Sequence, residues 1–285
     1  MIHLVFEGVA DAYDAARPGY PDELYAALEE LSDVRLAGST VIDVGAGTGI
    51  STRGLLDRGA RVVALDRGAG LLARLRSRTA DAPVLADGSR AVDPIGPVDG
   101  SRTANAAMPP DGSRTVNAAV LADGNALPIR DGAADLVTYA QAWHWLDPVP
   151  SVADAVRVTR PGGAIAGWWN STDARQADWL TALHVRLAEA CPDYWGPVRP
   201  GWSVPPLAET MRALGLDVAE TWLHWTRRLH VELYLTDLRS HSYIATLEPE
   251  KADALLARER AELYRAFPDG RLTIPMRVYL SVGRR

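Results

Sequence analysis

The stretch Val41–Gly49, which reads V-I-D-V-G-A-G-T-G, constrains the fold of this chain more than any other. A short run rich in β-branched residues ends there in three closely spaced glycines, which predicts a buried strand followed by a tight turn. Glycine has no Cβ, so the backbone can adopt a positive φ and come close to a ligand. Residues 50–56 continue with helical spacing. In open α/β sheets, a turn at the carboxyl end of such a strand is where ligands bind.

Composition sets broad limits on the function. The chain has 285 residues, 47% of them hydrophobic, which is enough for one large α/β domain with a substantial core. A formal net charge of −6 argues against nucleic acid as the main partner. One cysteine, Cys191, rules out an internal disulfide. The histidines lack metal-ligand spacing, so no metal site is expected. No leader segment or membrane-length apolar run is visible, so we expect a soluble cytoplasmic protein that does not enter a membrane.

Strand and helix patterns alternate along most of the chain, which favours a doubly wound α/β sheet. Further strands are expected at 61–65, 135–139, 164–169, 218–226 and 272–282, and late helices near 231–240 and 249–266.

The glycine turn itself allows two interpretations. A dinucleotide-binding turn needs G-x-G-x-x-G, whereas this chain has Gly45, Gly47 and Gly49 as G-x-G-x-G. Asp43 precedes them, and an acid there disfavours a pyrophosphate but suits a ligand with an ammonium group. The stretch resembles the D-x-G-x-G-x-G motif of the class I S-adenosylmethionine-dependent methyltransferases. The resemblance implies that these four residues bind S-adenosylmethionine, and an NAD(P)-dependent oxidoreductase of Rossmann type is the alternative.

A second acid comes after the next expected strand. Asp66 ends the run at 61–65, about 20 residues beyond the glycine turn, where an acid is placed to accept both ribose hydroxyls of a nucleoside. The alternative is a solvated aspartate in a surface turn.

The N-terminal segment carries a motif of its own. Residues 10–21 resemble A-x-x-Y-D-x-x-R-P-x-Y-P, the lid of the type 11 methyltransferases. The resemblance implies that Tyr13 closes over the reactive sulfonium and that Arg17 reaches the methionyl carboxylate or positions the lid. An arginine fork suits a carboxylate because it donates two parallel hydrogen bonds. Alternatively, both residues only pin the turn to the domain.

Residues 87–122 form a low-complexity insertion in which Asp-Gly recurs every 12 residues. Two copies of V-L-A-D-G, at 84–88 and 120–124, overlap the two ends of the insertion. Only the second copy is followed by the apolar pair Leu127 and Ile129, which resembles the family motif G-D-A-x-x-L-P-F. We therefore expect Asp123, rather than Asp87, to accept a hydrogen bond from the adenine amino group, with the backbone amide of Gly124 meeting a ring nitrogen.

The segment Gln141–Asp147 comes after the strand at 135–139 and should lie over the methyl donor. It matches the family pattern A-x-x-x-H-W at His144 and Trp145. A neutral imidazole can take a proton from a hydroxyl or amine nucleophile, so His144 is a candidate general base. It is equally suited to orienting the loop. Gln141, which opens the segment, is expected to contact the donor.

Together these stretches imply one methyltransferase domain over residues 1–285. The resemblance implies a Rossmann-like sheet of seven strands with the last one antiparallel. It also implies a lid at 1–38 and a small helical cap over the substrate at 170–215. The expected reaction is methyl transfer to an O, N or C atom of a small molecule. A non-catalytic S-adenosylmethionine-binding module remains a further alternative, and neither the acceptor nor the oligomeric state can be inferred.

Overall fold

A computed structural model describes residues 17–79, 84–85 and 116–285. Tyr13, Asp87 and most of the insertion lie outside the described residues. The chain divides into two compact units. The described residues within 20–169, 205–222 and 279–285 form a sheet unit, and 17–19, 170–204 and 223–278 form a helical unit.

In the described part of the chain, eight strands form one sheet in the order β3-β4-β2-β1-β5-β6-β8-β7. The strands are β1 (Thr40–Val44), β2 (Arg61–Asp66), β3 (Val84–Leu85), β4 (Ala118–Leu121), β5 (Ala134–Ala140), β6 (Thr159–Thr172), β7 (Asp217–His230) and β8 (Arg271–Arg284). β6, β7 and β8 have residues in both units, whereas the other strands belong to the sheet unit.

The parallel half of the sheet is built around β1, which is buried along its whole length. β1 pairs with β2 on one side and with β5 on the other, with Asp43 opposite Ala64 and Thr138. Such completely buried apolar strands are typical of parallel sheets covered on both faces. The chain continues from β1 to β2 on one side and reaches β5 only later on the other. The carboxyl end of β1 is therefore the topological switch point at which open α/β sheets bind ligands.

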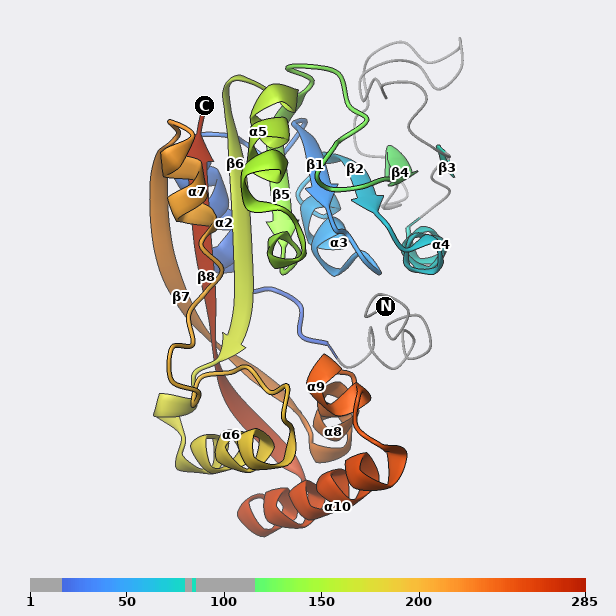
Figure 1. Ribbon diagram of the computed structural model, residues 1–285, viewed down its shortest axis with the longest axis vertical. Helices are drawn as coiled ribbons and strands as arrows, with labels where there is room; N and C mark the ends of the chain where they lie inside the picture. Colours follow the sequence, from blue (N-terminus) through green and yellow to red (C-terminus); the bar gives the residue numbers. More distant parts are fainter. Residues whose placement is uncertain (1–16, 80–83, 86–115) are drawn as a thin grey trace. The chain divides into compact units, whose positions relative to one another are not determined.

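The last strand, β8, lies between β6 and β7 and runs antiparallel to β6. Backbone bonds join Gly162 N to Arg285 O, Arg285 N to Gly163 O and Asp173 N to Pro275 O, so residue numbers rise along one strand as they fall along the other. Figure 1 shows β8 between its two neighbours. The predicted doubly wound sheet with an antiparallel last strand is confirmed.

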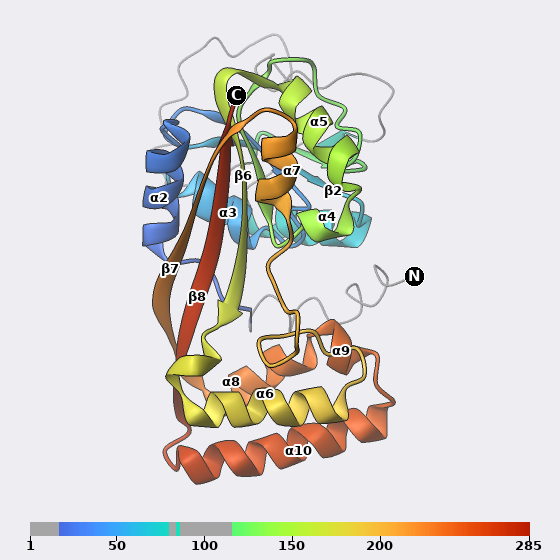
Figure 2. The same ribbon diagram turned by 60° about the vertical axis from the view of Figure 1, so that its left-hand side comes forward.

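Helices cover both faces of the sheet unit. α5 (Pro148–Val158) and α7 (Leu207–Ala213) lie on one face, and α2 (Asp22–Ser32) and α3 (Ile50–Leu56) lie on the other (Figures 1 and 2). α4 (Ala69–Arg78) comes after β2. The packing between α2 and α3 is close because Gly54 has no side chain: a Cβ there would lie 1.9 Å from the Tyr25 hydroxyl oxygen.

The helical unit has its own core. It contains α6 (Asp178–Ala190), α8 (Val231–Arg239), α9 (Ser242–Ala245) and α10 (Pro249–Ala266). Apolar side chains such as Leu183, Leu187 and Leu235 pack at its centre. Arg186 of α6 donates two parallel hydrogen bonds of 2.7 Å to Glu259 of α10, whose side chain is buried. None of the helices in the described ranges is long and apolar enough to span a membrane.

The neighbour of β2 on the side away from β1 is β4, the strand that precedes Asp123. β4 pairs with β2 from Val63↔Ala118 to Asp66↔Leu121. The two-residue strand β3, from the first V-L-A-D-G copy, pairs with the outer side of β4 and is the strand beyond the expected seven. Residues 170–204 belong to the helical unit and 205–215 to the sheet unit. The roles of 1–38 as a lid and 170–215 as a cap stay predictions.

Deletion of residues 87–122 should leave a folded protein. The product keeps one V-L-A-D-G copy followed by Asn125, and the same sequence results if 84–119 are removed instead. We expect the remaining copy to take the place of β4 beside β2, and the shorter connection to cost less closure entropy. Circular dichroism and thermal unfolding would test this, with deletion of the single repeat 99–110 as the control. A product without a cooperative unfolding transition, beside a folded control, would contradict the prediction.

Candidate active site

The glycine turn after β1 depends on backbone geometry that favours glycine. Gly45, Gly47 and Gly49 all have positive φ, at 70°, 57° and 86°. A Cβ at Gly45 would lie 2.4 Å from Cβ of Ala142, and one at Gly49 would lie 2.9 Å from Cγ of Leu75, so both positions are closely packed. A Cβ at Gly47 would meet nothing within 4 Å. The turn is therefore packed at both ends and open in the middle, which suits close approach of a ligand to the backbone.

The end of β2 holds this turn in place. The Leu65 carbonyl oxygen accepts hydrogen bonds from Gly45 N (2.8 Å) and Ala46 N (2.9 Å). The Asp66 carboxylate accepts one from Gly47 N (2.8 Å) through Oδ2 and one from Gly68 N (2.7 Å) through Oδ1. Asp66 thus lies at the carboxyl end of β2, beside the open middle of the turn, as the sequence predicted. Its contact with ribose hydroxyls stays a prediction.

Asp43 lies below the turn and is completely buried. Its Oδ2 accepts a hydrogen bond from Thr52 Oγ1 of α3 (2.7 Å), and its Oδ1 accepts one from Thr138 Oγ1 of β5 (2.8 Å). Burial raises the pKa of this carboxyl to about 6, although both hydroxyl bonds act in the opposite direction. Each carboxylate oxygen of Asp43 therefore has a hydroxyl partner from a neighbouring element of the sheet unit. The sequence did not identify the two threonines, because they lie 9 and 95 residues away.

Asp123 lies at the surface of the loop between β4 and β5. Its Oδ1 accepts a hydrogen bond from Asn125 N at 3.0 Å. Gly124 is buried, and a Cβ there would lie 2.9 Å from side-chain carbons of both Val44 and Leu146. Leu127, 3% exposed, anchors the loop. The loop therefore lies against the end of β1, as required if Asp123 and Gly124 are to contact a ligand bound at the switch point.

Gln141 comes directly after β5 and has a left-handed backbone conformation, which residues other than glycine seldom adopt. It is one of two non-glycine residues with positive φ in the described ranges, at 54°. Its backbone N–H donates to the Trp168 carbonyl at 2.9 Å, and its side-chain Nε2 lies 3.5 Å from the Tyr20 hydroxyl. Strained backbone of this kind clusters at functional sites. The geometry thus adds Tyr20, from the R-P-G-Y-P motif, to the residues around the carboxyl end of β5.

His144 lies in the 3₁₀ turn η2 (Trp143–Trp145), shortly after β5. The indole N–H of Trp169, on β6, donates a hydrogen bond to His144 Nδ1 at 3.2 Å. The His144 residue is partly accessible to solvent, while the protein atoms that crowd its ring lower the pKa of the imidazole to about 4 by partial desolvation. The ring is therefore neutral at pH 7.

The bond from Trp169 decides which tautomer the neutral ring adopts. A neutral imidazole has one donor and one acceptor nitrogen. Because Nδ1 accepts the indole hydrogen bond, Nε2 carries the proton and acts as a donor. In this arrangement His144 offers a substrate a hydrogen-bond donor, and a role as general base would require the Trp169 bond to break. The sequence pattern A-x-x-x-H-W carries no signal for this partner, which lies 25 residues further along the chain.

Arg17 belongs to the helical unit. Its Nε lies 3.6 Å from Asp237 Oδ1, and its Nη2 donates a long hydrogen bond of 3.5 Å to the Ser240 carbonyl oxygen. The predicted contact of Arg17 with a methionyl carboxylate stays a prediction. In the described part of the chain, no three His, Cys, Asp or Glu side chains come together in a way that could hold a metal ion.

Replacing Asp43 by Asn should stabilise the protein at neutral pH. The folded-state pKa of about 6 lies above the ordinary value of 3.8. The contribution of Asp43 to the free energy of unfolding is therefore fully present below about pH 4, and it is lost as the pH rises through 6. Between these limits the loss amounts to about 3 kcal/mol. Asn keeps the size of the side chain and cannot ionise. Urea unfolding from pH 4 to 8 should show the variant gaining stability relative to the parent across this interval, and a constant difference would exclude the raised pKa.

Comparison with known proteins agrees with this geometry. A family model for a methyltransferase domain matches residues 42–167, from β1 into β6. An uncharacterized methyltransferase of Mycobacterium tuberculosis is 30% identical over 257 residues, which cover 90% of this chain and 84% of the relative. An uncharacterized methyltransferase of Schizosaccharomyces pombe is 24% identical over 192 residues, covering 67% of this chain and 61% of the relative.

Solved structures share the fold. A protein from Anaeromyxobacter dehalogenans, described as a type II methyltransferase, superposes with a TM-score of 0.60 at 20% sequence identity. The superposition covers 94% of this chain and 97% of that one. With the glycine turn at the switch point and the antiparallel last strand, these matches lead to one conclusion: the chain belongs to the class I S-adenosylmethionine-dependent methyltransferases and is an enzyme of that family.

Proposed function

We propose that this methyltransferase acts on a small-molecule acceptor in the cytoplasm and that the carboxyl ends of β1, β2, β4 and β5 hold its methyl donor. The observation that carries the proposal is the open middle of the glycine turn at Gly47, bordered by the Asp66 carboxylate. The net charge of −6 supports a small molecule over nucleic acid. We further propose that no membrane is involved.

The residues at this edge fit S-adenosylmethionine. A Cβ at Gly47 would fill space that is open, which a bound nucleoside can occupy. Asp66 would accept from the ribose hydroxyls, and Asp123 with the amide of Gly124 would hold the adenine. Gln141 would contact the donor at the end of β5. Tyr13, which lies outside the described residues, is proposed to cover the donor. Arg17 is proposed to reach the methionyl carboxylate or to position the lid.

When bound, S-adenosylmethionine supplies a methyl group that is already activated by its positive sulfonium. The protein then needs above all to bring donor and acceptor into line, because alignment removes much of the barrier. The buried Asp43 carboxylate supports a positive ligand through its negative field. His144, with its proton on Nε2, would orient the acceptor by donating a hydrogen bond to it. This favours acceptor atoms that are nucleophilic without losing a proton to His144, such as a carboxylate oxygen.

S-adenosylhomocysteine, the product of the donor, should bind and raise the melting temperature, because it is selective for the folded state. Asp66→Ala should weaken its binding by about 1.5–3 kcal/mol through loss of charged hydrogen bonds. Asp193→Ala, at an exposed aspartate of the helical unit, should leave the affinity unchanged. Isothermal titration calorimetry measures the three affinities, and thermal unfolding of the parent with and without the ligand measures the shift in melting temperature. Absence of binding to the parent at millimolar ligand would overturn the donor site.

Substitutions of His144 should show whether its imidazole acts as a hydrogen-bond donor or as a general base. His144→Gln keeps a side-chain N–H and should retain most of the turnover once an acceptor is identified, whereas His144→Ala should lose more. A general base would instead contribute about 10²–10⁴-fold, and neither variant would retain it. The measurement is kcat for each variant over a range of pH, with S-adenosylhomocysteine affinity as the control for donor binding. Equal, large losses in both variants would show that His144 acts as a base.

A further inference from the structure

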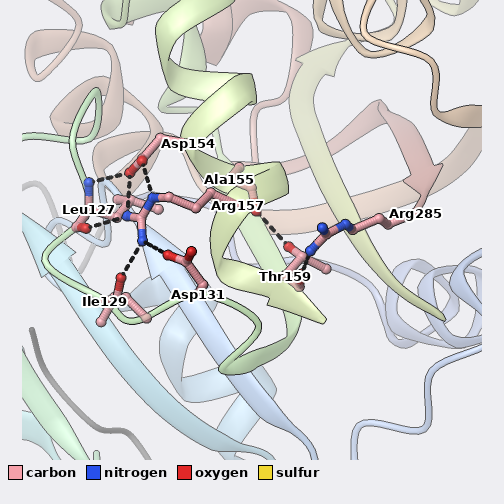
Figure 3. A network of polar contacts seen from close by, with 8 residues as sticks. All are labelled: Leu127, Ile129, Asp131, Asp154, Ala155, Arg157, Thr159 and Arg285. Carbon is pink, nitrogen blue, oxygen red and sulfur yellow. Dashed lines mark hydrogen bonds and ion pairs between the residues drawn. The ribbon is translucent and has the colours of Figure 1, made fainter. Parts of the chain in front are cut away.

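Arg157, near the end of α5, uses all of its hydrogen-bond donors, two of them on Asp154 of the same helix and three on the segment 127–131 (Figure 3). Its Nε donates to Asp154 Oδ1 (2.7 Å), and its Nη2 donates to Asp154 Oδ2 (3.2 Å) and to the Leu127 carbonyl oxygen (2.9 Å). Its Nη1 donates to the Ile129 carbonyl oxygen and to Asp131 Oδ1, both at 2.7 Å. A guanidinium has five N–H groups, so this set is complete.

The stretch that Arg157 holds is the irregular loop between β4 and β5. Between residues 122 and 133 the chain forms turns and an isolated bridge, with no helix or continuous strand. Backbone groups in such a segment need partners from elsewhere in the protein. Besides the two carbonyls bonded to Arg157, Leu127 N donates to Asp154 Oδ2 at 2.6 Å. The path of this loop therefore depends on side chains of α5.

The opposite end of α5 holds the first part of the same loop. Asp147 N, just before the helix, donates to Asn125 Oδ1 at 2.8 Å. Asn125 N in turn donates to the Asp123 carboxylate at 3.0 Å. A chain of contacts thus runs from the start of α5 through Asn125 to the acid assigned to the adenine.

α5 is firmly attached to the core, so it can serve as a reference for the loop. Its residues Ser151, Val152, Ala155 and Val158 are buried. Asp154 and Arg157 lie outside this buried set, spaced i, i+3, which places them side by side.

We infer that Arg157 is a positioning residue for adenine recognition: with Asp154 it fixes the loop that presents Asp123 and Gly124. One pocket of about 470 Å³ is lined by residues of both the loop and α5. They include Asp123 and Leu127 from the loop, and Asp154 and Arg157 from the helix. A shift of the Arg157 contacts therefore changes a wall to which Asp123 also belongs. The inference rests on the proposed function, in which this loop contacts the adenine of the donor.

The fork of Arg157 matters more than its charge. A lysine at this position keeps the positive charge but has three donors on one nitrogen, so it cannot bridge both carbonyls and both Asp154 oxygens. The arm to Asp131 differs from the rest because the Asp131 side chain is 78% exposed. Such an exposed ion pair contributes little. Asp131→Asn is therefore a matched control within the same network.

The test compares S-adenosylhomocysteine with S-inosylhomocysteine, which lacks the adenine amino group. The parent should prefer the adenosyl ligand by about tenfold or more, because the inosyl ligand leaves the loop's hydrogen-bonding groups unmatched. In Arg157→Lys this preference should fall towards unity, mainly through weaker binding of the adenosyl ligand. Asp131→Asn should keep the preference of the parent. Calorimetry gives both dissociation constants, and amide hydrogen exchange at Asn125 and Leu127 should be faster in Arg157→Lys without any ligand.

The outcomes are distinguishable. If the parent binds neither ligand, the proposed donor site fails. If the parent discriminates and Arg157→Lys discriminates equally, or if Asp131→Asn loses the preference as well, the positioning role of Arg157 is overturned. Should Arg157→Lys not fold, Asp154→Ala removes the partner of Leu127 N and is judged by the same ratio.

Discussion

The Asp66 carboxylate is the constraint on which the rest of the candidate site depends. It ends β2, yet it bonds to Gly47 N, which belongs to the turn after β1. The preceding carbonyl, that of Leu65, accepts from two further amides of the same turn. The glycines make positive φ possible, but these bonds select one conformation among those that glycine allows. The site is thus formed by the ends of two adjacent parallel strands, and neither strand alone determines its geometry.

Local sequence patterns predicted most of the sheet and the acids at its edge, because strand, turn and helix periodicities involve residues close together in the chain. Asp66 lies at the end of β2, as expected, and Asp123 comes after β4, which pairs with β2. The patterns did not predict the partners of these groups. Thr138 beneath Asp43 and Trp169 beside His144 are brought there by the order of the strands. No local pattern indicates the role of Arg157, since three of its bonds go to a loop 26–30 residues earlier.

The repeated segment shows how a sheet can accept extra sequence at its edge. Val84 and Leu85 repeat the pair Val120 and Leu121 of β4. They pair in parallel with β4 and do not take its place. The two copies differ in the residues that come after them. Only the second leads into Leu127 and Ile129, which are 3% and 1% exposed, and from there into β5. Burial of Leu127 and Ile129 stabilises the arrangement in which the second copy pairs with β2.

α5 connects the two ends of the site. It comes after the turn that holds His144, and Asp147 at its start bonds to Asn125 of the loop that presents Asp123. Trp143, in that same turn, donates its indole N–H to Ser151 of the helix at 3.0 Å, so the turn is attached to α5 as well. The buried face of α5 resists displacement, since interiors pack closely and deform little. The turn that holds His144 and the loop that holds Asp123 are therefore both attached to the same helix. One helix thus supports two segments that lie outside the regular strands of the sheet.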